Sequence, residues 1–416
     1  MKNSIKQSTK LYSTVLALGS LATSATAGAA DFADDVYDAL AGGKVSLDLR
    51  LFFERLEEDN PLDDASLLSL RSRLGYETGK INNFSALLEF ENTTAIGNDD
   101  NYSLPAASPF SAGVGQSIIP DPEFSEVNQA YLNYSGFDET VIKLGRERIN
   151  LDNQRFIGSV AWRQNEQTFD GFSISNNSLS DTSLFYSFAS NANNVFGANI
   201  DVDLHILNAA YNGFTAGKLV GYAYLSDFQN ANTNDNRTVG IRFDGATPVG
   251  GNEKILYTAE YARQSDSNDN PNSFDHDYIL AEGGLAFGPG ISAKLSYELL
   301  GSENGDTGFF TPFSTIHKFQ GWADVFLVPT SSALGLPNGI EDIHFTLAGK
   351  AGPINLVGVY HDFSSDVGGI DYGSEFNFLA TTKVGRFDLG AKFADYSADE
   401  FGVDTTRYWF WVQTSI

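Results

Sequence analysis

The 416-residue chain has no cysteine, only five histidines, and 26 basic residues against 53 acidic ones. The absence of cysteine excludes disulfides and thiolate metal sites. The histidines lack the HExxH spacing of zinc proteases, and there is no cysteine nucleophile. We therefore predict no catalytic residues, no cofactor and no metal site. The net charge of −27 also argues against a generic nucleic-acid binder.

Long hydrophobic runs are also missing, apart from a short one near the N-terminus. Three lysines in the first ten residues precede an apolar stretch over 11–21, and small residues follow up to Ala30. This order is typical of a secretory signal peptide, and the run is shorter than the about 20 residues that a spanning helix needs. We therefore predict a signal peptide over 1–27, with cleavage after Ala29 an equally good fit. The mature chain would carry a charge of about −30.

From Val45 to the last residue, apolar and polar residues alternate with a period of two, which is the primary signal of a β-strand. Between 45 and 54 the odd positions are apolar and most even positions are polar, so each set shares one face. About 18 segments follow this rule, each near the ten residues that a tilted barrel strand needs. Their expected spans are 44–54, 67–78, 83–92, 126–135, 139–148, 168–176, 182–189, 200–211, 217–226, 237–245, 253–263, 277–287, 290–300, 342–350, 353–363, 372–383, 386–396 and 405–416.

The links between these segments alternate in length. Short links occur at 79–82, 135–138, 288–289, 351–352 and 384–385, and medium-sized links near 212–216 and 246–252. Long polar links occur at 55–66, 93–125, 149–167, 190–199, 227–236, 264–276, 301–341, 364–371 and 397–404. Outer-membrane barrels alternate short periplasmic turns with long outer loops. The all-β prediction is thus a transmembrane antiparallel barrel over 44–416, after a short periplasmic segment over 28–43.

A secreted sandwich or solenoid would also show alternation, and is the alternative fold. A sandwich rarely has so many strands in one domain, and a solenoid would show a sequence repeat, which is missing. At the C-terminus Tyr408, Phe410 and Val412 share one face, and Trp409 and Trp411 share the other. Aromatic residues near strand ends predict a girdle at the membrane interface.

Three stretches resemble the alginate-export type of outer-membrane porin. They are 43–91, with Leu70-Arg71-Ser72-Arg73-Leu74; 144–170, with Leu144-Gly145-Arg146-Glu147-Arg148 and Trp162-Arg163-Gln164-Asn165-Glu166; and 317–324, with Phe319-Gln320-Gly321-Trp322. Together they cover about a fifth of the chain. The resemblance implies an 18-stranded monomeric barrel with an arginine-bearing constriction. A polyuronate exporter would have a strongly cationic interior, whereas this chain is acidic, so we do not carry over the alginate substrate.

Charged residues on the polar face are the candidates for the lumen. Arg50, Arg71 and Arg73 lie on adjacent early strands and could form one patch, with acidic residues of the same face as partners. Opposite charges inside a pore create a field that filters small solutes. The alternative is that these pairs only brace the wall.

The segment 146–170 is the strongest candidate site, because it is too polar to face lipid. Arginine can bind a carboxylate with two hydrogen bonds, amides can bind hydroxyls, and an aromatic plane supports a flat solute. As an outer link it could fold into the lumen and bind an acidic sugar or small anion, or it could plug the barrel without recognising anything. Its candidates are Arg146, Arg148, Asn150, Asp152, Asn153, Gln154, Arg155, Trp162, Arg163, Gln164, Asn165 and Glu166.

Lys318, Trp322 and Asp324 lie in the long link 301–341. They could join the same constriction or pack as an outer lid with Phe309, Phe310 and Phe313. The run 266–270 is similar to a calcium loop, but proline replaces the glycine needed at the sixth position, so a solvated loop is the better interpretation.

We predict an outer-membrane porin that passes small hydrophilic solutes, anionic or sugar-like, by diffusion through an arginine-bearing constriction. The alternative in transport is a dedicated exporter or importer of an acidic polysaccharide. The competitor from another class is a non-conducting barrel serving in adhesion or as an enzyme. The expected partners are membrane lipid, lipopolysaccharide and small solutes, not nucleic acid, and a monomer is favoured.

Overall fold

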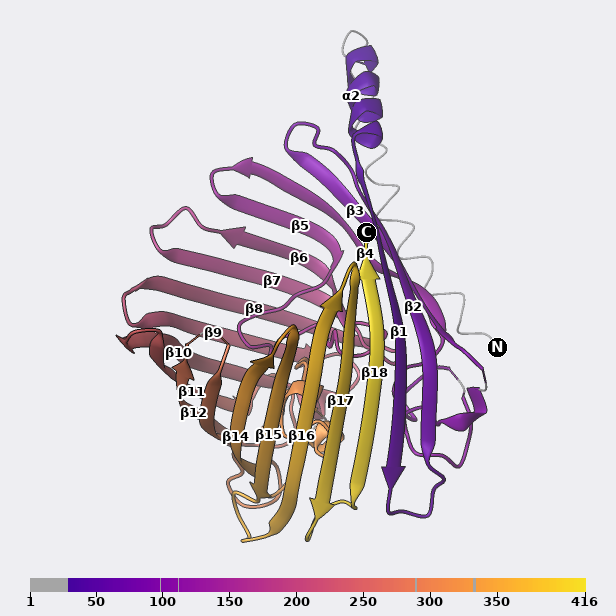
Figure 1. The fold of residues 1–416 in the computed structure, drawn as a ribbon. Helices are drawn as coiled ribbons and strands as arrows, with labels where there is room; N and C mark the ends of the chain where they lie inside the picture. Colours follow the sequence, from indigo (N-terminus) through magenta and orange to yellow (C-terminus); the bar gives the residue numbers. More distant parts are fainter. Residues whose placement is uncertain (1–28, 98, 111, 289, 332–333) are drawn as a thin grey trace.

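The computed structural model describes residues 29–416, except for residues 98, 111, 289 and 332–333. The predicted signal peptide and its cleavage positions lie outside or at the edge of these residues. Within the described chain, eighteen antiparallel strands form one sheet that closes on itself (Figure 1). Closure comes from the pairing of the first strand with the last, in a register that sets Leu51 against Val412. A closed sheet leaves no edge with unpaired backbone groups, as a membrane requires.

The strands lie within a few residues of the predicted spans, so the strand prediction is confirmed. The first nine are β1 (Lys44–Glu58), β2 (Ala65–Glu77), β3 (Phe84–Ala95), β4 (Phe124–Phe137), β5 (Thr140–Glu147), β6 (Thr168–Asn176), β7 (Thr182–Asn193), β8 (Asn199–Phe214) and β9 (Gly217–Phe228). The others are β10 (Asn236–Gly250), β11 (Glu253–Asp266), β12 (Asp275–Phe287), β13 (Ser292–Leu300), β14 (Ile340–Ala351), β15 (Ile354–Ser364), β16 (Asp371–Val384), β17 (Phe387–Ala398) and β18 (Thr405–Ser415).

Helices are few and short among the residues that the structure describes. They are α2 (Ala29–Ala41), α3 (Leu327–Ser331) and the 3-10 turns η1 (Asp99–Asn101), η2 (Asn232–Asn234) and η3 (Ile316–Lys318). No helix among the described residues is long and apolar enough to cross a bilayer. We predicted no helix over 28–43, although its alanines are strong helix formers. Helix α2 packs on the β2–β3 turn, where Gly79 N donates to Ala39 O at 2.8 Å.

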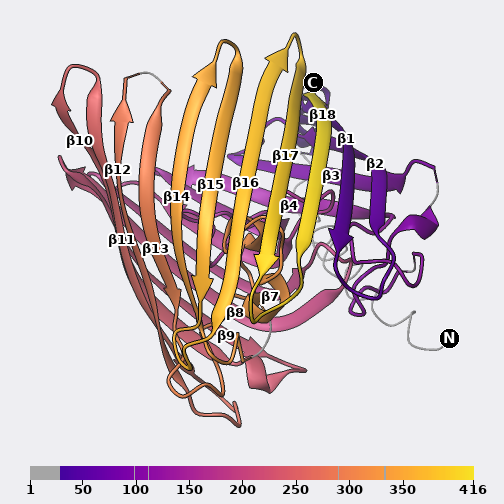
Figure 2. The same cartoon turned by 60° about the horizontal axis from the view of Figure 1, so that its bottom comes forward.

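The two rims of the barrel differ, as the alternation of link lengths predicted. Short turns, the C-terminus and α2 lie at one rim, and the long loops begin at the other (Figures 1 and 2). The links near 212–216 and 246–252 are short rather than medium-sized, because β8 and β10 extend further than expected. Exposed phenylalanines flank five of the short turns, namely Phe84, Phe137, Phe214, Phe287 and Phe387. Aromatic residues at such a position are typical of a membrane-interface girdle. Of the C-terminal aromatics from which we predicted a girdle, Phe410 is exposed, whereas Trp409 is fully buried inside the barrel.

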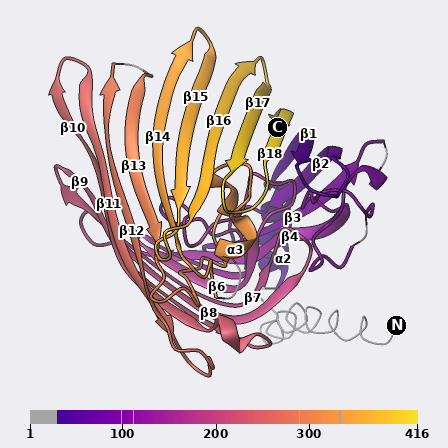
Figure 3. The ribbon, with the colours of Figure 1, turned by 90° about the horizontal axis from the view of Figure 1, so that it is seen from below.

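Alternate residues face outward and inward along each strand. On β1, Leu51 is exposed, whereas Phe52 and Glu54 are fully buried. The outward faces carry the exposed apolar side chains, and the inward faces carry most of the buried charges. The barrel is not an open tube, because segments after β5 and β13 fold into it and pack on its inner wall (Figure 3).

Candidate functional site in the lumen

Two long loops, loop 148–167 and loop 301–339, meet inside the barrel. Gly158 N donates to Phe313 O at 2.9 Å, and Thr315 N donates to Gln154 O at 3.0 Å. Phe156 packs against Phe309, with 5.9 Å between ring centroids. Because these bonds join backbone to backbone, the two loops form one body inside the lumen.

Arg163 anchors this body to the wall. Its guanidinium contacts Glu54 of β1 at 2.6 Å, Asp324 of loop 301–339 at 2.6 Å and Asp121 at 3.6 Å. Arg407 of β18 adds a second contact to Glu54, at 2.8 Å. Arg163 is 1% exposed, so the cluster is sealed from solvent. The predicted lining residue therefore holds one loop to the other and both to the closure strands.

The charged groups of this cluster stabilise one another in their ionised forms. Burial opposes ionisation of Asp324, but His317, its hydrogen bond and Arg163 together lower the pKa of the carboxyl group below its usual value. Burial likewise disfavours the charged form of Arg163, whereas Glu54 and Asp324 raise its pKa above the usual value. Both groups are thus ionised at neutral pH, and removal of either would leave an unpaired buried charge.

A ring of aromatic side chains surrounds Lys392 of β17. The ammonium lies 4.1 Å from the ring centre of Trp162 and 3.9 Å from that of Trp322, one from each inner loop. His317 stacks on Trp162 with centroids 4.8 Å apart and an interplanar angle of 5°. The Lys392 ammonium donates to His317 Nε2 at 2.6 Å, and His317 Nδ1 donates to Asp324 at 2.7 Å. This polarity fits a neutral imidazole, because one ring nitrogen accepts and the other donates.

The predicted arginine patch on β1 and β2 exists, but its members are buried in contacts. Arg50 donates to the carbonyl of Trp162 at 2.8 Å and lies 4.4 Å from the Phe52 ring centre. Arg71 contacts Asp48 at 2.6 Å, and Arg73 contacts Glu166 at 2.7 Å. These contacts favour the bracing interpretation for this patch.

Arg146 and Arg148 of the next cluster keep part of their surface. Arg146 forms two hydrogen bonds to Asp170, at 2.6 and 3.0 Å, with its side chain 19% exposed. Arg148 contacts Glu166, and Glu89 at 3.5 Å, with its side chain 29% exposed. Since Glu166 also receives a bond from Asn128, this carboxylate is the hub that joins the loop to β2 and β4.

The amides expected to bind hydroxyls hold the loop itself instead. Asn150 accepts from Ser159 N at 2.8 Å, and Asn153 accepts from Arg155 N at 3.1 Å. Further amide bonds tie Gln154 to Thr315, Gln164 to Ser69, and Asn165 to Thr93 and Pro122. The hydrogen-bonding groups of these amides are thus turned toward the protein.

Arg155 and Asp152 fasten the other side of the loop. Arg155 is fully buried, with its Nε 2.9 Å from Glu298 of β13 and its Nη2 donating to Gln320 at 3.0 Å. Asp152 accepts from Asn208 at 2.7 Å and lies 3.6 Å from the Lys218 ammonium. Like Arg163, Arg155 is out of reach of the lumen.

Lys318 differs from the buried cations. It sits in the 3-10 turn η3 with an exposed side chain, and its ammonium donates only to the carbonyl of Asn153, at 3.0 Å. Burial of the ammonium among protein atoms, together with Arg242 and Lys294 on the wall, lowers its pKa. Glu282 and Glu298 oppose this shift, because their carboxylates favour the charged form of Lys318.

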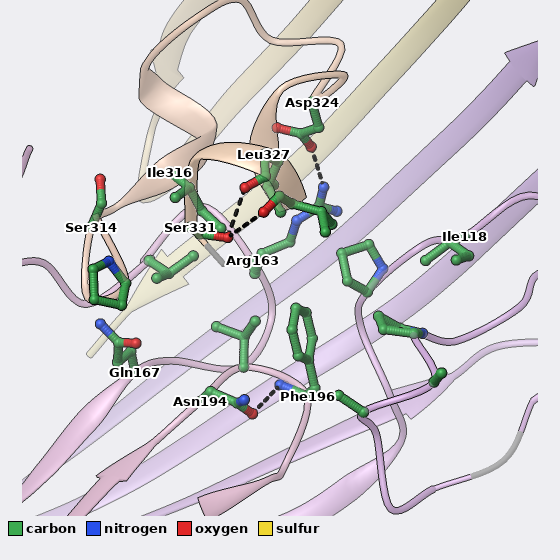
Figure 4. Close-up of a pocket in the computed structure, with 18 of the residues that line it drawn as sticks. Ile118, Arg163, Gln167, Asn194, Phe196, Ser314, Ile316, Asp324, Leu327 and Ser331 are labelled. Carbon is green, nitrogen blue, oxygen red and sulfur yellow. Dashed lines mark hydrogen bonds and ion pairs between the residues drawn. The ribbon is translucent and has the colours of Figure 1, made fainter. Parts of the chain in front are cut away.

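A cavity of about 630 Å³ lies where the inner loops meet the 96–123 and 194–198 loops. Figure 4 shows apolar side chains such as Ile118, Phe196 and Leu327 around it, with the Arg163–Asp324 pair at one side. It is large enough for a small organic molecule, and most of its lining is apolar.

The structure places loop 301–339 inside the barrel, which decides between the two arrangements left open for Lys318, Trp322 and Asp324. Phe309, Phe310 and Phe313 are buried rather than part of an outer lid. The sequence did not point to Asp121, Lys392 or Arg407. Lys392 and Arg407 stand at inward positions of late strands, and that parity was the one signal that could have found them.

Comparisons with known proteins agree with this architecture. The model of the alginate export family matches residues 53–289. The chain belongs to the alginate export family. A comparison with curated proteins gave no significant match.

Solved structures share the fold at low sequence identity. OpdK of Pseudomonas aeruginosa, crystallised with vanillate, gives a TM-score of 0.69 at 12% identity, covering 91% of this chain and 99% of that one. OccAB4 of Acinetobacter baumannii gives 0.67 at 13%, covering 90% and 98%. OpdL of Pseudomonas aeruginosa gives 0.66 at 14%, covering 91% and 99%. The chain, a member of the alginate export family, thus has the same barrel fold as these solved structures, as predicted.

Proposed function

We propose that the barrel is a selective diffusion channel for small solutes that carry a carboxylate. The observation that carries this proposal is Lys318, an exposed residue in the η3 turn of an inner loop whose ammonium donates to a backbone carbonyl and not to a carboxylate. Arg146 and Arg148 offer two further cations that reach the lumen. Cations lining a narrow passage favour entry of anions.

The apolar cavity beside Arg163 favours a solute with a hydrophobic body over a sugar polymer. The vanillate named with OpdK is a small aromatic carboxylate, and a solute of that class would suit a cavity of about 630 Å³. Most lumen arginines here are neutralised by carboxylates, so a polyuronate chain would meet few free cations along its path. Export or import of an acidic polysaccharide stays the second candidate, because the family match favours it.

Recording in planar bilayers tests the channel. We expect stable single-channel conductance, an anion preference in a salt gradient, and partial block by benzoate-class acids at lower concentrations than by uronate oligomers. The absence of conductance would contradict the channel, and stronger block by the oligomers would favour the polysaccharide alternative.

Replacing Lys318 with glutamate should remove the anion preference or reverse it, because the change places a negative charge in the η3 turn of the inner loop. Lys80→Glu is the matched control, since Lys80 lies exposed in the β2–β3 turn and its ammonium contacts Ser135. The reversal potential measures both. An equal shift in the two variants would point to overall charge instead of this site.

A further inference from the structure

Two histidines and an aspartate converge on the inner wall. Asp342 and His344 lie on β14, and His361 lies on β15 directly opposite His344 in the strand register. Their neighbours along the strands, residues 343, 345 and 360, are exposed on the outer face of the barrel. Because side chains alternate between the two faces, Asp342, His344 and His361 face the lumen. One ligand atom from each lies within 4.8 Å of the others.

The distances fit ligation as well as they fit hydrogen bonding. His361 Nδ1 lies 2.9 and 3.1 Å from the two carboxylate oxygens of Asp342. His344 Nδ1 lies 3.3 Å from Oδ1, yet it has no hydrogen-bond partner. Ligands at 2.0–2.2 Å from a tetrahedral ion are about 3.3 Å apart, so small side-chain shifts would bring all three onto one ion.

A buried carboxylate without a full set of partners stands next to the triad. Glu375 of β16 is the cross-strand neighbour of His361 and is 1% exposed. Its Oε1 accepts from the backbone N–H of Ala323 at 2.9 Å, whereas its Oε2 has no hydrogen-bond partner. Cross-strand neighbours on one face have Cβ atoms about 4.5–5.5 Å apart. A fourth ligand is therefore within reach, and His344 keeps 18% of its side chain open to the lumen for entry of an ion.

We propose that Asp342, His344 and His361 bind a divalent transition metal of the Zn²⁺ class. Two imidazole nitrogens with one carboxylate oxygen suit zinc, cobalt or nickel, whereas calcium and magnesium prefer oxygen ligands alone. This departs from the sequence-based expectation of no metal, because His361 follows His344 by 17 positions and Asp342 by 19, and comes next to them only through the β14–β15 hairpin.

Such an ion would act on the inner loops as well as on the wall. His361 stacks on Phe363 at 5.3 Å, and Phe363 packs on Phe326 of loop 301–339 at 4.8 Å. Glu375 holds the same loop through Ala323. His361 and Glu375 thus belong to the metal site and also support loop 301–339, so ion binding is coupled to the position of that loop.

Isothermal titration calorimetry tests the site. The full-length barrel is first treated with a chelator and is then titrated with Zn²⁺ in detergent. We expect one equivalent per barrel, and at least a tenfold loss of affinity in His344→Gln and in His361→Gln. His276→Gln is the matched control, because His276 also faces the lumen, on β12, but contacts only Thr307 among polar groups, at 3.0 Å. Heat-dependent mobility on gels verifies that each variant barrel is folded.

Co²⁺ absorption on the unaltered protein gives a second measurement that needs no variant. A tetrahedral nitrogen–oxygen spectrum saturating at one equivalent, displaced by Zn²⁺ but not by Ca²⁺, supports the site. No binding, equal competition by Ca²⁺, or an equal loss in His276→Gln overturns it. None of these outcomes depends on conductance or on anion selectivity. The metal-site proposal can therefore be wrong while the channel proposal is right, and the channel proposal can be wrong while the metal-site proposal is right.

Discussion

Arg163→Met is expected to destabilise the folded barrel by about 3–5 kcal/mol and to raise its mean single-channel conductance. The substitution leaves the buried carboxylates of Glu54, Asp121 and Asp324 without their shared cation. Loss of one partner in a buried ion cluster has that magnitude because the remaining charges stay desolvated. Loop 148–167 also loses its ion pair with Glu54 of β1 and keeps only hydrogen bonds to that strand, such as the one from Arg50 to Trp162 O, so we expect larger and more frequent conductance fluctuations.

Urea unfolding in micelles measures the change in stability, and bilayer recordings measure the change in conductance. Arg55→Met is the matched control, since Arg55 lies on β1 next to Glu54, forms an exposed pair with Glu57 and should change stability by only about 0–1 kcal/mol. Asp121→Asn placed in the Arg163→Met background should restore part of the stability, because it removes one unpaired charge and still accepts from Gln164 N. Equal stability losses in Arg55→Met and Arg163→Met would show that the cluster does not hold the loop.

The fold was predictable from sequence because lipid imposes a strict period on every strand. Leu51 and Val412 face outward as their parity required, and the short turns and long loops alternate as expected. The inward faces were less predictable. Phe52 and Trp409 occupy inward positions but are apolar, since they pack on Trp162 of the inserted loop rather than on water. A period of two identifies which residues share a face, and it does not identify what fills the lumen.

The site was only partly predictable, because its residues lie far apart in the sequence. The segment after residue 144 carried a local signal, an unusual density of arginine and amide side chains. Its partners carry none, because Arg163 meets Asp324 across 161 residues and Glu54 across 109. Such contacts follow from how the loops fold into the closed barrel, so the roles of Arg155 and Arg163 as anchors became visible only in three dimensions.

Acidification should loosen the inner loops through His317. Burial lowers the pKa of this imidazole from its ordinary value of 6.5 to about 3, and the neighbouring Asp324 carboxylate opposes the shift only in part. Between pH 6.5 and 3 the unfolded or released segment therefore binds a proton that the packed segment does not. The stability of the packed form is complete above pH 6.5 and falls by up to about 1.4 kcal/mol for each pH unit below it. Asp324, whose pKa is below its ordinary value, adds a loss in the same direction at still lower pH.

We expect conductance fluctuations to increase steeply as the pH of both bilayer chambers falls from 7 to 4. A protonated His317 can no longer accept from Lys392, so the contact at 2.6 Å becomes a repulsion between two cations. His317→Gln should flatten this pH response, because an amide can donate to Asp324 and accept from Lys392 without titrating in that range. His205→Gln is the control, since His205 is exposed on the outer face of β8 and bonds only to Tyr186, at 2.9 Å. An unchanged pH response in His317→Gln would assign the acid sensitivity to other groups, and the relay from Lys392 to Asp324 would then serve packing alone.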